Sequence, residues 1–154
     1  MKYKKYLKII LLIFLINSCG FKPINQGANF KIENFELIGD KKINYIIKNK
    51  INNRSNESGK RIDLQVKTKK NKIIKEKNIK NEITKYEITI FSEIKYTIIE
   101  QNSQKQFIVS SKGELNVKNK YSDTLSNEKN LIKSLTDDLI KKITQNIVTE
   151  INAL

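Results

Sequence analysis

Residues 84–100 read TKYEITIFSEIKYTIIE and show the clearest alternation of apolar and polar side chains in the sequence. The apolar positions are Tyr86, Ile88, Ile90, Ile94, Tyr96 and Ile98, and the other positions include Thr89, Phe91, Lys95 and Thr97. Because strand side chains point alternately to two faces, this pattern predicts a β-strand with one buried face. At about 3.3 Å per residue, an unbroken strand of this length would span roughly 50 Å.

The segment that follows predicts an antiparallel partner for this strand. Residues 101–104 (QNSQ) are polar and predict a turn. Residues 105–119 then alternate again, with Phe107, Val109, Leu115 and Val117 on one face. Gly113 lies inside this second strand, where an isolated glycine predicts a bulge.

Two shorter strands and a helix are predicted upstream. Residues 62–66 alternate as a half-buried strand. Residues 30–38 predict a first strand whose apolar phase shifts near Asn34, which indicates a bulge or break. Between these strands, Asp40 is a suitable N-cap for a helix that ends near Asn53. Its apolar stripe consists of Ile43, Ile46, Ile47 and Ile51.

The last part of the chain predicts a long amphipathic helix that begins at Ser126 as its N-cap. Leucine and isoleucine recur every fourth residue from Leu131 to Ile151, and the opposite face is charged. Such a helix could lie on a membrane, but its mixed charges favour packing on a sheet. We therefore expect an α+β domain over residues 30–154, of order β-α-β-β-β-α. Its sheet would have about four mostly antiparallel strands with two helices on one face.

The N-terminus has the features of an exported lipoprotein. Residues 1–18 combine four lysines with the apolar run IILLIFLI, as a secretory signal peptide does. The run is too short to cross a bilayer, which needs about 20 residues. The segment 16–20 (INSCG) resembles the lipobox of bacterial lipoproteins, in which the cysteine is acylated and becomes the first residue. Cys19 is therefore the predicted lipid attachment site, and residues 19–29 are a predicted tether.

Composition excludes several classes of function. The chain has no histidine and one cysteine, so it cannot form an intramolecular disulfide, a Ser–His–Asp triad or a Cys–His pair. We expect no enzyme, cofactor or metal site, although a Ser–Lys dyad stays open.

Without the signal-peptide lysines, the 30 basic residues become 26 against 16 acidic ones, a net charge of about +10. This charge favours anionic partners, or it reflects a composition rich in Lys, Ile and Asn. Export disfavours nucleic acid.

The most basic stretch is residues 67–80 (KTKKNKIIKEKNIK). It could form a hairpin arm or a long loop that projects from the sheet. A solvated hairpin explains its composition, and an arm that contacts phosphate groups is the functional alternative. The candidate phosphate contacts are Lys67, Lys69, Lys70, Lys72, Lys75 and Lys77.

Three segments resemble the lipopolysaccharide (LPS)-assembly lipoprotein family, LptE, in its alphaproteobacterial form. The opening CGFKPI, residues 19–24, is similar to the family's Cys-Gly-Phe, one variable residue, Pro and an aliphatic residue. The second segment is ITKY, residues 83–86, which leads into a long strand. The third runs from Gly113 through Tyr121 into a closing helix.

The resemblance implies a function and partners. Members of that family are lipid-anchored on the periplasmic side of the outer membrane. They plug a large outer-membrane β-barrel of the LptD type, assist its assembly and bind LPS. An unrelated lipoprotein that acts as an adaptor in an envelope complex is the alternative, and an envelope hydrolase is a third reading.

Overall fold

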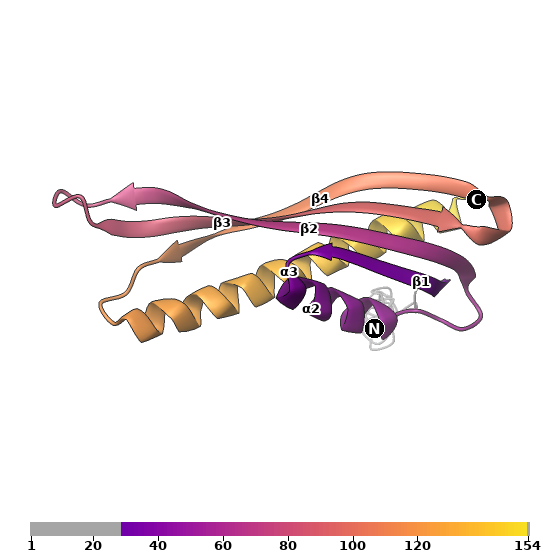
Figure 1. The fold of residues 1–154 in the computed structure, drawn as a ribbon, viewed down its shortest axis with the longest axis horizontal. Helices are drawn as coiled ribbons and strands as arrows, with labels where there is room; N and C mark the ends of the chain where they lie inside the picture. The colour runs from indigo at the N-terminus through magenta and orange to yellow at the C-terminus, as the bar shows by residue number, and fades with distance from the viewer. Residues whose placement is uncertain (1–28, 154) are drawn as a thin grey trace, which may run out of the picture.

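A computed structural model describes residues 29–153. Its elements are β1 (Phe30–Gly39), α2 (Lys41–Asn52), β2 (Lys60–Lys77), β3 (Ile83–Ile98), the short 3-10 turn η1 (Ile99–Gln101), β4 (Ser103–Asn116) and α3 (Tyr121–Asn152). Figure 1 shows the sheet as one layer and the two helices as the other. The α+β class and the order β-α-β-β-β-α predicted from the sequence are confirmed. Residues 1–18, Cys19 and most of the tether lie outside the described residues.

The sheet has the strand order β1-β2-β3-β4. β1 runs parallel to β2, and the other two pairs are antiparallel. β3 pairs with β4 along its length, from Lys85 opposite Asn116 to Ile98 opposite Ser103. The predicted irregularity in the first strand is also confirmed, because the register shifts between Ile32 and Asn34.

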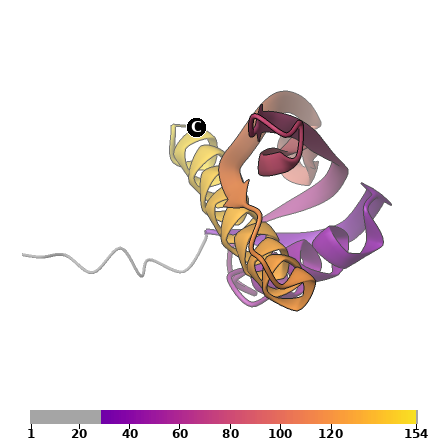
Figure 2. The same ribbon diagram turned by 90° about the vertical axis from the view of Figure 1, so that its left-hand side faces the viewer.

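Both helices cover one face of the sheet, and Figure 2 shows them side by side beneath it. Asp40 caps α2 as predicted, since its carboxylate accepts hydrogen bonds from the backbone N–H of Lys42 and Ile43. A 2.6 Å ion pair between Lys50 and Asp137 joins α2 to α3. The helical part of the core consists of Ile43, Ile47, Ile51, Leu135, Leu139, Ile140, Ile143, Ile147 and Ile151. The final helix therefore packs on the sheet, as its pattern predicts.

The final helix begins earlier than the sequence predicts. α3 begins at Tyr121 with Lys120 as its N-cap residue, so the predicted N-cap at Ser126 is wrong. The first turn is mostly exposed and has no apolar stripe to mark it. Its anchor is polar instead: the Thr124 hydroxyl accepts a 2.8 Å hydrogen bond from the backbone N–H of Lys118.

The predicted bulge at Gly113 is also wrong. Gly113 lies opposite Ile88 in a register without a shift. A Cβ atom at this position would lie 2.8 Å from Cδ1 of Leu131 and 3.3 Å from Cδ2 of Leu135. Gly113 therefore lets α3 approach β4 closely, which a side chain would prevent.

The lysine-rich stretch forms the hairpin arm rather than a loop. β2 continues to Lys77, far beyond the predicted 62–66, and its register with β3 ends at Ile83. The side-chain oxygen of Asn78 closes the turn by accepting hydrogen bonds from the backbone N–H of Lys80 and Glu82. Figure 1 shows this hairpin reaching beyond the other strands at one end of the molecule. Within residues 29–153, neither helix is long and apolar enough to cross a membrane.

Candidate functional site

Side chains along β2 point alternately to the two faces of the sheet, so the six candidate lysines do not all lie on one face. Ile62, Leu64 and Val66 face the helices and are buried, so the residues between them point to the opposite face of the sheet, called the outer face. Lys67 and Lys69 belong to the outer face. Lys70 and Lys72 belong to the face that carries the helices. The six side chains thus do not form one cluster.

The two lysines on the helix side are held by acidic partners. Nζ of Lys72 lies 2.7 Å from a carboxylate oxygen of Glu128 on α3, and it also lies 4.3 Å from the ring centroid of Tyr86. Lys70 lies 3.6 Å from the carboxylate of Asp40. These contacts join the hairpin to the two helices, so both ammonium groups have a structural role.

Lys75 and Lys77, near the end of the arm, also have partners. Lys75 lies 2.6 Å from Glu114 and 3.4 Å from Glu87. The hydrogen bond to Glu114, followed by that to Glu87, raises the pKa of Lys75. The same hydrogen bond from Lys75 is the main reason that the pKa of Glu114 is lowered. Lys77 donates a 2.9 Å hydrogen bond to the side-chain oxygen of Asn81.

Lys67 and Lys69 are different, because the ammonium group of neither forms an ion pair or a hydrogen bond within residues 29–153. Glu93 is opposite Lys67 in the register. Its carboxylate instead lies 3.7 Å from Lys95 and accepts a 3.3 Å hydrogen bond from Gln106. The two ammonium groups are therefore available to an external anion.

Two apolar side chains also point to the outer face, and one of them lies beside Lys69. Phe91 is opposite Lys69 and is 42% exposed. Ile108, on β4, is opposite Glu93 and is 70% exposed. Lys112 also points outward from β4 and forms no ion pair within the described residues. We call Lys67, Lys69, Phe91, Ile108 and Lys112 the outer-face patch.

The chemistry of the outer-face patch suits an anionic amphiphile. Neighbouring strands are about 4.8 Å apart, and alternate residues along a strand are about 7 Å apart. Lysine ammonium groups can bind phosphate oxygens by charge-assisted hydrogen bonds. Phe91 lies next to Lys69, and Ile108 lies on β4, where Glu93 separates it from Lys67; both offer apolar surface to a hydrocarbon chain. A ligand with phosphate groups next to acyl chains would match both properties.

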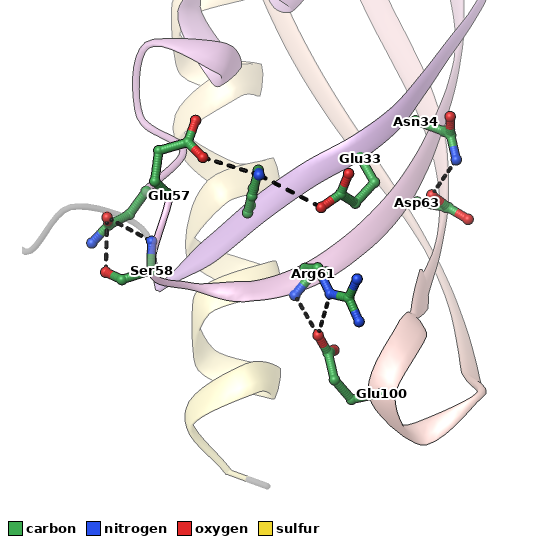
Figure 3. A network of polar contacts seen from close by, with 9 residues as sticks. Glu33, Asn34, Glu57, Ser58, Arg61, Asp63 and Glu100 are labelled. Atoms are coloured by element: carbon green, nitrogen blue, oxygen red, sulfur yellow. Dashed lines mark hydrogen bonds and ion pairs between the residues drawn. The ribbon is translucent and has the colours of Figure 1, made fainter.

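The end of the sheet near Phe30 has the opposite electrostatic character (Figure 3). Lys31 lies 3.0 Å from Glu57 and 3.7 Å from Glu33, and the hydrogen bond to Glu57 is the main cause of its raised pKa. Arg61 lies 2.9 Å from Glu100, and this contact lowers the pKa of that carboxyl. Each of these cations has an acidic partner, so this network stabilises the sheet end rather than attracting an anion.

The sequence pattern predicted Lys67 and Lys69 as candidates but not the other members of the outer-face patch. Phe91 occurs at an otherwise polar position of its strand, and Ile108 interrupts the alternation between Phe107 and Val109. The sequence did contain a signal for these two residues: each is apolar at a strand position where the alternation predicts a polar side chain. The register that brings Lys112 near them follows only from the folded sheet.

The fold is that of bacterial lipoproteins whose structures have been solved. Rare lipoprotein B from Shewanella oneidensis matches with a TM-score of 0.62 and 12% identity, over 78% of this chain and 98% of that one. A protein from Caulobacter crescentus CB15 that is described as a lipoprotein matches with a TM-score of 0.58 and 7% identity, over 84% of this chain and 96% of that one.

A third structure agrees with these two. Lipoprotein B from Nitrosomonas europaea has a TM-score of 0.56 and 10% identity, over 83% of this chain and 90% of that one. No family model and no curated protein sequence matches this chain. At these identities the likeness shows the fold, and it extends over nearly the whole of each of the three lipoprotein domains.

Proposed function

We propose that this chain is an outer-membrane lipoprotein that acts in LPS assembly, as plug and assembly factor of an LptD-type β-barrel. It would be anchored by acylated Cys19 on the periplasmic side, and its role would be non-enzymatic. The observation that carries the proposal is the shared fold with lipoproteins over 90% or more of their chains. Export and acylation of such a domain agree with the segment around Cys19.

The outer-face patch supports the lipid part of the proposal. Lipopolysaccharide carries phosphate groups next to acyl chains, and the patch places Lys67, Lys69 and Lys112 on the same face of the sheet as two exposed apolar side chains. Of the six lysines predicted to contact phosphate, we assign this role to Lys67 and Lys69. The other four are engaged by Asp40, Glu128, Glu114 and Asn81.

Partner identity tests the proposal most directly. The acylated full-length chain should co-purify with a large outer-membrane β-barrel after mild detergent extraction. Recovery of a different envelope complex would favour the adaptor alternative. Isolation of the chain as a monomer without a barrel, from membranes that still contain intact barrels, would contradict the proposal.

A charge-reversal variant tests the lipid contact separately. Lys67→Glu with Lys69→Glu should weaken binding of LPS by the full-length protein about a hundredfold or more, since each of the two charge-assisted contacts contributes about 1.5–3 kcal/mol. The matched control is Lys129→Glu with Lys133→Glu on the exposed face of α3, which changes the net charge equally. Equal loss in both variants would indicate general electrostatic attraction and would contradict a specific role for the outer-face patch.

A further inference from the structure

The exposed face of α2 is a second surface with unbalanced charge. Ile43, Ile47 and Ile51 are buried against the sheet, which fixes the rotation of the helix. At about 100° per residue, Tyr45 then lies nearly opposite this buried stripe. Tyr45 is 68% exposed. The helix therefore presents a large aromatic side chain at the centre of its outward face.

Lysines surround Tyr45 on this face. Lys41 and Lys42 lie one turn before it and Lys48 one turn after it, and all three are exposed. The twelve residues of α2 include four lysines and no acidic residue. Within residues 29–153 the only α2 lysine that forms an ion pair is Lys50, which contacts Asp137. We call Lys41, Lys42, Tyr45 and Lys48 the α2 face.

The α2 face lies near the point where the tether reaches the domain. The loop after α2 is bound to the first described residues, since the N–H of Asn56 donates to the carbonyl of Phe30 and that of Lys60 to the carbonyl of Asn29. Only residues 20–28 separate Cys19 from Asn29, an extended reach of about 35 Å at most. An acyl chain on Cys19 would therefore keep this end of α2 close to the membrane.

We propose that the α2 face docks on the phosphate headgroups of an anionic lipid layer. Lysine ammonium groups would contact the phosphates, and Tyr45 would lie at the headgroup level, where tyrosine is favoured by its apolar ring and polar hydroxyl. The acyl chains on Cys19 would hold the domain at the layer, and a basic surface beside them adds an electrostatic attachment that orients it. Docking of the α2 face depends on the acylation in the proposed function but not on the barrel.

The test uses a fluorescent thiol label on the purified, acylated full-length chain in vesicles. Asn49→Cys places the label on the exposed side of α2 without altering the α2 face, and Gln104→Cys places it on the outer face, outside the outer-face patch, as the control. Mass spectrometry first verifies the acyl group. Phosphatidylcholine vesicles are compared with vesicles that also contain phosphatidylglycerol, and brominated lipids serve as quenchers.

We expect the label at residue 49 to shift to the blue and to be quenched only in vesicles with phosphatidylglycerol. The label at residue 104 should stay in water in both. About 1 M salt should reverse the shift, because the screening length falls to about 3 Å. Reversal of Lys41, Lys42 and Lys48 to Glu should abolish it, since each lysine near an anionic surface contributes roughly a fivefold factor. The matched control reverses Lys129, Lys133 and Lys141 on α3 and should keep the shift.

Three results would overturn the inference. One is a label at residue 49 that is as accessible to water as the label at residue 104. Another is a shift that is equal in neutral vesicles and insensitive to charge reversal. The last is a shift that appears only after outer-membrane proteins are added, which would assign the α2 face to an acidic protein partner. Co-purification with a barrel is measured independently, so failure here leaves the proposed function open to its own test.

Discussion

At the scale of single residues, the hydroxyl of Tyr96 stands out in the core. The side chain is 1% exposed, and its ring meets Phe107 edge-on, with centroids 6.2 Å apart and planes at 71°. Its hydroxyl has no hydrogen-bond partner within the described residues. Burial, with a further contribution from Glu150, raises the pKa of Tyr96 to about 12. A buried hydroxyl without a partner costs about 1–3 kcal/mol.

We therefore expect Tyr96→Phe to stabilise the domain by about 1 kcal/mol, because it removes the hydroxyl and keeps the ring contact. Urea unfolding at neutral pH measures this. The raised pKa also predicts that the free energy of unfolding falls as the pH rises from 10 towards 12, since the unfolded state ionises first. Tyr96→Phe should lack this contribution. Destabilisation of the variant by 1 kcal/mol or more would show that the hydroxyl has a partner (about 1 kcal/mol is a typical hydrogen bond).

Gly39 ends β1 in a conformation that few other residues adopt. Its φ is +108°, and a Cβ atom would lie 2.0 Å from the carbonyl oxygen of Thr68. Gly39→Ala should destabilise the domain by at least about 2 kcal/mol, from the unfavourable φ and the displaced carbonyl. The neighbouring Ile38→Ala, at an exposed position, should change the free energy of unfolding by less than about 0.5 kcal/mol. Similar values for the two variants would contradict this account of Gly39.

At the scale of elements, the sequence predicted most of the strands and helices because their apolar residues meet one core. The apolar residues alternate over the whole of residues 84–100, and leucine or isoleucine recurs every fourth residue along α3. Patterns of this length identify a strand and a helix without ambiguity. The length of β2 was not predictable in this way. Beyond Thr68 the strand is exposed on both faces. Most of its residues there are lysines or other polar residues, so no alternation of apolar and polar side chains marks it as a strand. The start of α3 was missed for the same reason, since its first turn has no apolar stripe.

The hairpin arm depends on charge where it lacks a core. Lys75 and Lys85 both contact Glu114, and Lys85 also contacts Glu76 at 2.7 Å. The pKa of Glu114 is lowered, mainly by the hydrogen bond from Lys75. A lowered pKa in the folded state means that the contribution is present above the ordinary value of 4.5 and is lost as the pH falls through the folded-state value.

Acid should therefore loosen the arm before it unfolds the domain. We expect amide hydrogen exchange of residues 72–87, corrected for its intrinsic pH dependence, to accelerate a few-fold below pH 4.5, because exposed ion pairs contribute little each. In Glu114→Gln the same amides should exchange faster at pH 7 and show a smaller acid step. The core of β3 around Ile94 serves as the internal reference. An acid step of equal size in the two proteins would assign the effect to other carboxyls.

At the scale of the whole molecule, charge is distributed unevenly over the surface. The network around Lys31 and Arg61 balances its cations, and in the arm carboxylates balance Lys70, Lys72, Lys75 and Lys85. The outer-face patch and the α2 face keep theirs unbalanced. The net charge alone could not identify these two surfaces, because the sum does not say which lysines have acidic partners or which lie beside exposed aromatic and apolar side chains. Strand register and helix rotation, which follow from the core, supply that information.

The last prediction concerns the attachment of the whole domain to the membrane. If Cys19 carries the lipid, Cys19→Ser should prevent acylation and move the protein from the outer-membrane fraction to the soluble periplasmic fraction or leave an unprocessed precursor. Metabolic labelling with a fatty acid and mass spectrometry of the N-terminus measure the first step, and membrane fractionation measures the second. Ser18→Ala, a conservative change at the residue before the cysteine, is the control and should still be acylated. Acylated Cys19→Ser protein in the outer membrane would contradict the assignment. Unacylated protein that remains there in high salt would show that binding to a membrane partner, rather than the lipid, holds the domain in place.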